Sequence, residues 1–400
     1  MVALRLKLCY EIANPRLLPP RGSTMKKGNC RLSLILAVVV AIAAIIQLYI
    51  SICIPGPVNH DSSDIVEISG QHSSMSACLI IMDDNHFLVE WIAYHYLYLP
   101  LRRLIVAVDP KSQTSPSEIL GRYSSRGLID ITIWNDTDYL DPSTMDNSLP
   151  PLYQHAIRQN AFIAACLRVL KEEKRNWVYV VDTDEFVFPN RHASEGSPIY
   201  KITHYKTLLG TLQHPGNQDM GKFMIKYPCF PIFRLDMLPT KESSPAEIQP
   251  LVPPGLPGAR LLTFRYRWPD DPHRPNPMFW VKTMIDVSQV NETDIRAEEG
   301  NCHMVLKNVC GMNGRVDFDY SPFIIYHYHG TLEHIVYRRG KEIGTRFWNH
   351  FSALNATWKD DTPLFWLQKF VDELGAELAQ KLLAGAGENV EGESQRGEWW

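Results

Sequence analysis

Four short apolar runs that alternate with helical stretches constrain the fold of this chain most strongly. The apolar runs are residues 77–82, 101–108, 127–134 and 177–181. Residues 86–99 and 154–173, between these runs, have the apolar spacing of helices. Alternation of this kind predicts an α/β fold, in which parallel strands form a sheet and helices cover both of its faces.

Acidic residues follow three of these predicted strands. They are Asp83 and Asp84, then Asp109, then Asp182 and Asp184. Ligands of open α/β sheets bind beyond the carboxyl ends of the strands, and carboxylates gathered at one edge repel one another unless a cation or hydrogen-bond donors hold them. The pattern favours a cation site over the structural alternative, in which these acids only cap helices or face solvent.

Asp182 and Asp184 are separated by one residue, so a turn can direct both carboxylates to one point. Mn²⁺ and Mg²⁺ prefer oxygen ligands, and a cation held there could neutralise the charge of a departing diphosphate. His327, at the end of a later apolar run, is the third candidate metal ligand. A core or surface histidine is the alternative interpretation of both His327 and His329.

The uncharged segment 32–54 is long enough to span a bilayer. The preceding residues 1–31 carry seven Lys and Arg against one acid, a net charge of +6, which predicts that they stay in the cytoplasm. A signal peptide has a shorter apolar core, and a buried core helix would contain polar positions. The chain is therefore expected to be a single-pass type II membrane protein with a lumenal body.

The lumenal body has a net charge of −10, the difference between the total of −4 and the +6 of the first 31 residues, so we do not expect a nucleic-acid partner. Three Asn-x-Thr sequons begin at Asn135, Asn291 and Asn355, as expected in a lumen. Five cysteines follow the apolar segment, enough for two disulfides at most. Cys302 with Cys310 and Cys78 with Cys166 are the candidate pairs, and buried thiols that never meet are the alternative.

The chain divides into five expected parts: a basic cytoplasmic tail (1–31), a transmembrane signal anchor (32–54), a polar stem (55–75), a catalytic domain (76–385) and a disordered tail (386–400). Within the domain, the Pro- and Gly-rich residues 239–258 predict a long surface loop. Arg338 and its basic neighbours could neutralise a nucleotide diphosphate, although a solvated basic helix face is equally consistent with them.

Three segments, in order within about residues 77–350, resemble family 92 glycosyltransferases and related GT-A enzymes of the family 2-like type. The first is a Glu-Trp-x-x-Tyr-His helix, matched by Glu90, Trp91, Tyr94 and His95. The second is a D-x-D-E-F element, matched by Asp182, Asp184, Glu185 and Phe186. The third is a late His-Tyr pair, matched by His327 and Tyr328.

This resemblance implies a GT-A-like, Rossmann-like mixed sheet. It also implies a Mn²⁺- or Mg²⁺-dependent hexosyltransferase of the Golgi membrane, moving a sugar from a nucleotide donor such as UDP-galactose onto a glycan or glycoprotein. Lys282 and His303 fall where similar proteins carry a Lys-bearing strand and a later His. The relatives often read Lys-Asn-Glu where this chain has Asp83, Asp84 and Asn85, residues that tend to face the nucleotide base.

The expected donor-binding residues are therefore Asp83, Asp84, Asp109, Lys282, His303 and Arg338. Inversion at the sugar would need a general base, for which Asp317, Asp319 and Glu333 are candidates by position. A non-catalytic, membrane-anchored glycan-binding protein is the alternative function. A haloacid dehalogenase-type phosphotransferase fits less well, because its D-x-D belongs on the first core strand.

Overall fold

The computed structural model describes residues 74–145, 148–149, 151–192, 228–239, 241–272, 282–296, 305–310, 318–321, 323–332, 335–336, 340–354, 356 and 358–386. The predicted signal anchor and nearly all of the stem and tail lie outside these ranges and stay predictions. Within the ranges, no helix combines the length and apolar character needed to cross a membrane. Asn135 and Asn291, two of the three sequon asparagines, are exposed.

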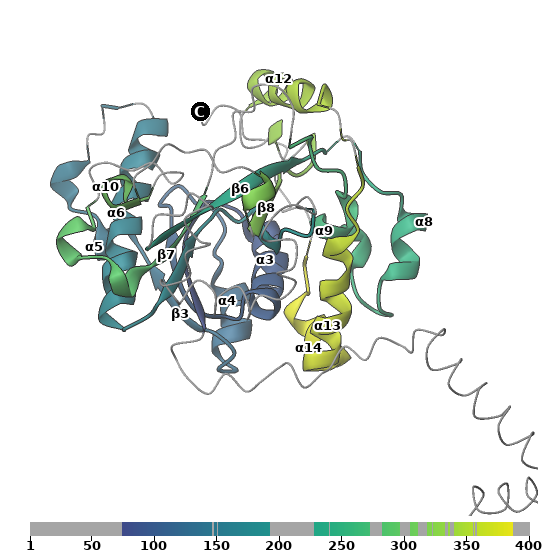
Figure 1. Ribbon diagram of the computed structural model, residues 1–400, viewed down its shortest axis with the longest axis horizontal. Coiled ribbons are helices and arrows are strands. Elements are labelled where there is room, and N and C mark those ends of the chain that lie inside the picture. The colour runs from purple at the N-terminus through teal and green to yellow at the C-terminus, as the bar shows by residue number, and fades with distance from the viewer. Residues whose placement is uncertain are drawn as a thin grey trace, which may run out of the picture. The chain divides into compact units, whose positions relative to one another are not determined.

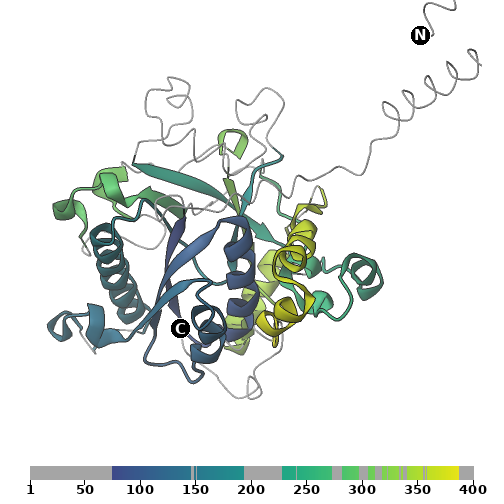
Figure 2. The same ribbon diagram turned by 90° about the horizontal axis from the view of Figure 1, so that it is seen from below.

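Eight strands form one mixed sheet (Figures 1 and 2). They are β1 Met75–Ile81, β2 Leu101–Val108, β3 Asp130–Trp134, β4 Trp177–Val180, β5 Glu185–Pro189, β6 Cys229–Met237, β7 Lys282–Asp286 and β8 Phe323–Tyr328. The order across the sheet is β3-β2-β1-β4-β7-β6-β8-β5. The predicted mixed sheet is confirmed, and the four apolar runs that suggested parallel strands (β1 to β4) pair in parallel with one another.

Strand direction decides which chain segments meet at one edge. β7 runs antiparallel to both β4 and β6, and β6 is parallel to β8, so β6 and β8 point the same way as β1, β2 and β4. β5 is antiparallel to β8. The carboxyl ends of six strands and the amino ends of β5 and β7 therefore share one edge, which we call the carboxyl edge.

Helices cover both faces of the sheet (Figure 1). They are α3 Asn85–Tyr98, α4 Ser117–Ser124, α5 Asp136–Tyr139, α6 Pro151–Glu172, α8 Pro245–Ile248, α9 Leu262–Arg265, α10 Lys307–Cys310, α12 Lys341–Ser352, α13 Phe365–Leu374 and α14 Ala376–Leu382. One face packs against α3, α4, α13 and α14, and the other against α6 and α10. Burial on both faces explains why β1 and β4 are almost continuously apolar rather than alternating.

Two disulfides tie helices to the sheet. Cys78 of β1 pairs with Cys166 of α6, which confirms that prediction. Cys310 of α10 pairs with Cys229 at the start of β6, so the expected Cys302–Cys310 pair is wrong. Proximity in sequence suggested Cys302, but the packing of α10 against the sheet face that includes Cys229 decided the partner.

Residues 239–258 are more ordered than the loop that their composition predicted. Ser244 begins α8 with a capping box, in which its hydroxyl accepts the Glu247 N–H while the Glu247 carboxylate accepts the Ser244 N–H. Ile248 at the end of α8 is buried. A local capping motif and one apolar anchor thus shorten the expected loop.

Helix α3 holds strand β5, which lies at the edge of the sheet. Trp91 Nε1 donates to the carbonyl of Glu185 at 3.0 Å, and the Tyr94 hydroxyl donates to the carbonyl of Val187 at 2.8 Å. The Val187 N–H donates to His95 Nε2 at 3.3 Å. Side chains of α3 therefore bind backbone groups of β5 that face away from β8, where a further strand would otherwise pair.

Glu90, on the same helix, anchors the start of α9. Its carboxylate accepts the backbone N–H groups of Leu262 at 2.7 Å and Thr263 at 3.1 Å, and the Thr263 hydroxyl at 2.6 Å. The segment Glu-Trp-x-x-Tyr-His, which resembled a glycosyltransferase motif, is thus a set of polar contacts that fixes two other elements. Because this segment of α3 packs against β5, it also positions the turn with Asp182 and Asp184, which lies between β4 and β5.

Candidate functional site

The sheet register gathers charged side chains at the carboxyl edge. His327 of β8 lies opposite Asp236 of β6 on one side and Glu185 of β5 on the other. Arg234 precedes Asp236 by two residues and therefore points to the same face of the sheet. Lys282, the first residue of β7, lies opposite Ile232. Ile232 precedes Arg234 by two residues, so Lys282 points to this face as well. One face at the carboxyl edge thus carries Glu185, Arg234, Asp236, Lys282 and His327.

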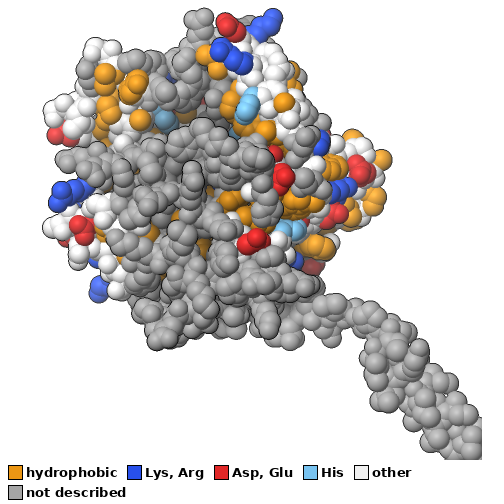
Figure 3. Space-filling model, turned by 45° about the horizontal axis from the view of Figure 1, so that its top comes forward, with side chains coloured by type: hydrophobic (Ala, Val, Ile, Leu, Met, Phe, Trp, Pro, Cys, Tyr) orange, Lys and Arg blue, Asp and Glu red, His pale blue; other side chains and the backbone are white. Residues whose placement is uncertain are grey.

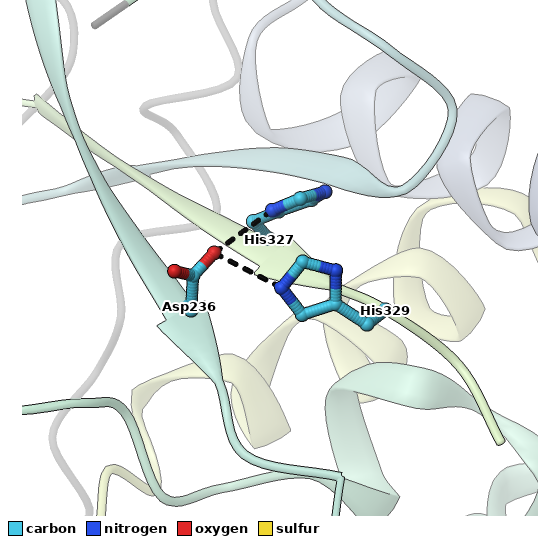
Figure 4. Close-up of side chains that lie close together, drawn as sticks. All are labelled: Asp236, His327 and His329. Carbon is cyan, nitrogen blue, oxygen red and sulfur yellow. Dashed lines mark hydrogen bonds and ion pairs between the residues drawn. The ribbon is translucent and has the colours of Figure 1, made fainter. Parts of the chain in front are cut away.

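The cluster centres on His327, whose two ring nitrogens face two carboxylates. Its Nδ1 lies 2.9 Å from Asp236 Oδ1, and its Nε2 lies 3.4 Å from Asp184 Oδ2. His329 Nε2 lies 3.1 Å from the same oxygen of Asp236. Figure 4 shows both imidazoles directed at Asp236. Asp236, His327 and His329 are close enough together to hold a metal ion.

Electrostatic interactions set the protonation of this cluster. Burial by itself would lower the pKa of His327, but the charge of Asp184 and the contacts with Asp184 and Asp236 raise that pKa to about 9. Burial would raise the pKa of Asp236, yet the two imidazoles hold it well below its ordinary value. Burial, and then the positive charge of His327, lower the pKa of His329 to about 4. Near neutral pH, therefore, a charged His327 lies between two carboxylates.

A second set of charges lies beside the first. The buried Lys282 Nζ is 2.8 Å from Asp182 Oδ2 and 3.1 Å from Glu185 Oε2. Arg234 lies 3.4 Å from the other oxygen of Glu185, and that carboxylate also accepts the backbone N–H of Asp182. Glu185 is therefore neutralised by two cations and holds the Asp182–Asp184 turn in place.

The two acids of the D-x-D motif have different neighbours. Asp184 is 11% exposed and lies at His327, whereas Asp182 is 39% exposed and lies at Lys282. Of the predicted ligands, the structure brings Asp184 and His327 together directly. Lys282 contacts the motif itself, and its predicted contact with the donor stays a prediction. That Asp182, Asp184 and His327 bind a metal stays a prediction.

The other predicted acids also lie at the carboxyl edge, where they organise loops. Asp83 Oδ1 accepts the N–H groups of Gln113 at 2.7 Å and Thr114 at 2.8 Å. Asp84 precedes α3, and its Oδ2 accepts the N–H of Met82. Asp109 Oδ2 lies 3.3 Å from His155 Nδ1, at the start of α6. Contact with a donor stays a prediction for all three.

Asp319 does not join the cluster. It lies just before the amino end of β8, near the far end of β5, whose following residue Asn190 donates to the carbonyl of Phe318. At about 3.3 Å per residue along β8, this is roughly 15–20 Å from His327. The remaining predicted site residues, Asp317, Glu333, His303 and Arg338, lie outside the described residues.

Sequence reasoning missed Asp236 and Arg234, and it considered His329 without choosing it as a ligand. The available signal was the strand sequence of residues 229–237, in which Arg234 and Asp236 alternate with buried apolar residues. Charged residues at alternate positions of an otherwise apolar strand indicate that one face is used for polar contacts. Nothing local indicated that this strand pairs with β8.

On the described part of the face in Figure 3, Lys and Arg side chains are interspersed with Asp and Glu rather than gathered in one basic patch. Binding to the phosphate backbone of a nucleic acid requires clustered basic side chains. That the chain has no nucleic-acid partner stays a prediction.

Comparison with known proteins does not identify the chain. No family model matches it, and no curated protein matches it. Among solved structures, an active-site mutant of LgtC aligns at 11% identity over 71% of this chain and 98% of that chain, with a TM-score of 0.25. A TM-score of this size does not establish a common fold, so functional inference depends on the site itself.

Proposed function

We propose that this protein is a metal-dependent glycosyltransferase of the Golgi membrane, which moves a hexose from a nucleotide donor to a glycan or glycoprotein. UDP-galactose is the proposed donor, and the anomeric configuration is inverted. The observation that carries the proposal is the meeting of Asp184 with His327 at the carboxyl edge of an α/β sheet. The resemblance of the surrounding motifs to family 92 glycosyltransferases supports the choice of reaction.

The residues present suit a divalent cation. Two ligands at right angles on a metal, each about 2.1 Å away, are roughly 3 Å apart, and Asp184 Oδ2 is 3.4 Å from His327 Nε2. Carboxylate and imidazole together suit Mn²⁺. When bound, such a cation supplies positive charge to a leaving diphosphate. Asp182, held by Lys282, would lie beside it as a further ligand or as an acceptor for a donor hydroxyl.

The chain's own residues position these groups. Lys282 and Arg234 neutralise Glu185, so the acidic turn can be held close to the sheet without an uncompensated buried charge. Through its contacts with Trp91, Tyr94 and His95, β5 keeps the turn at a fixed position. Of the three candidates for the general base that activates the acceptor hydroxyl, Glu333 is the one proposed, because Asp319 is at the opposite edge and Asp317 precedes it by only two residues.

The test is release of UDP from a panel of nucleotide sugars by the full-length protein in detergent, with Mn²⁺ and then with EDTA. We expect turnover of UDP-galactose that EDTA and Asp184→Asn abolish. Asp372→Asn, which alters an exposed carboxylate of α13, is the matched control and should retain it. Failure of every donor to bind, with and without metal, would refute the transferase and favour a glycan-binding protein.

A further inference from the structure

Asp236 accepts hydrogen bonds from two imidazoles at a single oxygen. Its Oδ1 lies 2.9 Å from His327 Nδ1 and 3.1 Å from His329 Nε2. A carboxylate can only accept, so each ring nitrogen presents its N–H to that oxygen. In its charged form His327 carries a proton on each ring nitrogen. A cation that binds at Nε2 must displace the proton there, and the proton held on Nδ1 by Asp236 then leaves the lone pair on Nε2, the nitrogen that faces Asp184.

Aromatic side chains also hold His329. Its ring contacts Phe351 at 4.0 Å and Phe347 at 5.1 Å between centroids, both on α12. Figure 1 shows α12 beyond the ends of β6 and β8. This packing fixes the direction from which His329 donates to Asp236, and the strand pairing of Asp236 with His327 fixes the other direction.

We propose that Asp236 is a positioning residue for a cation site formed by Asp184 and His327 Nε2. Accepting the Nδ1–H of His327 selects the ring tautomer and orients the ring, as a carboxylate behind a metal-bound histidine does in metalloproteins. This role rests on the proposed metal dependence, but cation binding can be measured without turnover. The alternative is that Asp236, His327 Nδ1 and His329 Nε2 are themselves the ligands.

The two arrangements make different demands on Asp236. A positioning residue needs an acceptor oxygen, which an asparagine side chain keeps, whereas a metal ligand needs the negative charge. Asp236→Asn should therefore weaken binding less than Asp236→Ala, which removes the acceptor. Loss of a carboxylate behind a histidine ligand costs about 10–100-fold in metal affinity.

The experiment is titration of metal-free full-length protein in detergent with Mn²⁺ alone, by calorimetry and by the Mn²⁺ electron paramagnetic resonance signal. We expect about 10–100-fold weaker binding for Asp236→Ala. For Asp236→Asn we expect a weakening of about 2–10-fold, because a neutral amide is a weaker acceptor than a carboxylate. Asp184→Asn should lose binding outright. Asp286→Asn, a buried strand carboxylate at the opposite edge, is the matched control and should bind as the wild type does.

Thermal melting of each variant separates binding from folding, and Asp236→Asn decides the question even if Asp236→Ala does not fold. If Asp236→Asn binds as poorly as Asp184→Asn, Asp236 is a ligand and the positioning role is wrong. If Asp236→Asn and Asp236→Ala both bind as the wild type does, Asp236 has no role in binding. If the wild-type protein binds no Mn²⁺, the proposed function is wrong in its metal dependence, and the role proposed for Asp236 is wrong with it.

Discussion

His95 Nε2 accepts the backbone N–H of Val187, a residue 92 positions later in the chain, at 3.3 Å. Its Nδ1 lies 2.8 Å from the carbonyl of Trp91, one helical turn earlier. The ring is fully buried and is therefore a neutral link between α3 and the edge strand β5. Because β5 begins directly after Asp184, this link also helps to position Asp184 at the candidate site.

Replacing His95 should destabilise the protein. His95→Leu leaves the Val187 N–H buried without its acceptor, which costs about 1–3 kcal/mol of unfolding free energy. Urea unfolding at pH 7.5 measures the change. His350→Leu, at an exposed position near the end of α12, is the control and should shift stability by less than about 0.5 kcal/mol. An equal effect at both positions would contradict the link.

The same residue predicts a pH dependence. Burial lowers the pKa of His95 from 6.5 to about 3, despite the opposing effect of its hydrogen bond to Trp91. The unfolded chain therefore binds a proton that the folded protein does not, and the stability present above pH 6.5 is lost as the pH falls toward 3. As the pH falls from 7 to 5, the unfolding free energy of the wild type should fall by about 2 kcal/mol relative to that of His95→Leu. A constant difference across that range would disprove it.

Glu90 predicts that stability depends on pH in the opposite direction. Burial raises its pKa from 4.5 to about 7, although the contacts with Thr263 and Leu262 lower it. The folded protein then keeps a proton that the unfolded chain releases, so stability is greatest below pH 4.5 and is lost as the pH rises to 7. As the pH rises over that interval, the unfolding free energy of Glu90→Gln should increase by about 3 kcal/mol relative to that of the wild type. The check is the unfolding free energy of both proteins at pH 4.5 and 7.5.

Lys282 should matter to stability more than a surface lysine does. Lys282→Met removes a buried partner of Glu185, and breaking such a pair costs about 3 kcal/mol. The double variant Lys282→Met/Glu185→Gln should recover much of this loss, because it removes the stranded charge. Lys381→Met, which breaks an exposed pair on α14, should change stability by at most about 1 kcal/mol. Chemical denaturation of all three variants provides the measurement.

Peptide mapping without reduction tests the disulfides. We expect cross-linked peptides that contain Cys78 with Cys166 and Cys229 with Cys310. Removal of either bridge by paired Cys→Ala substitution should lower the unfolding free energy by about 2–5 kcal/mol, because each closes a loop of more than 80 residues in the unfolded chain. A peptide joining Cys302 to Cys310 would contradict the second bridge.

The sequence by itself determined the local elements and the direction of the first strands. The apolar runs at β1, β2 and β4 and the apolar spacing of α3 and α6 are set by burial on both sides of a sheet, which is a local property of the chain. The acids after these strands could be placed at one edge for the same reason. These features predicted that Asp182 and Asp184 lie at the carboxyl edge.

Only the tertiary structure decided which distant residues meet there. Asp236 and His327 are 91 positions apart, and they are neighbours because β6 pairs in parallel with β8 in one particular register. Cys310 likewise pairs with Cys229 rather than with the nearer Cys302 because α10 packs on β6. Pairing of this kind depends on how whole elements pack against each other, and that information is spread over the chain rather than carried by any local pattern.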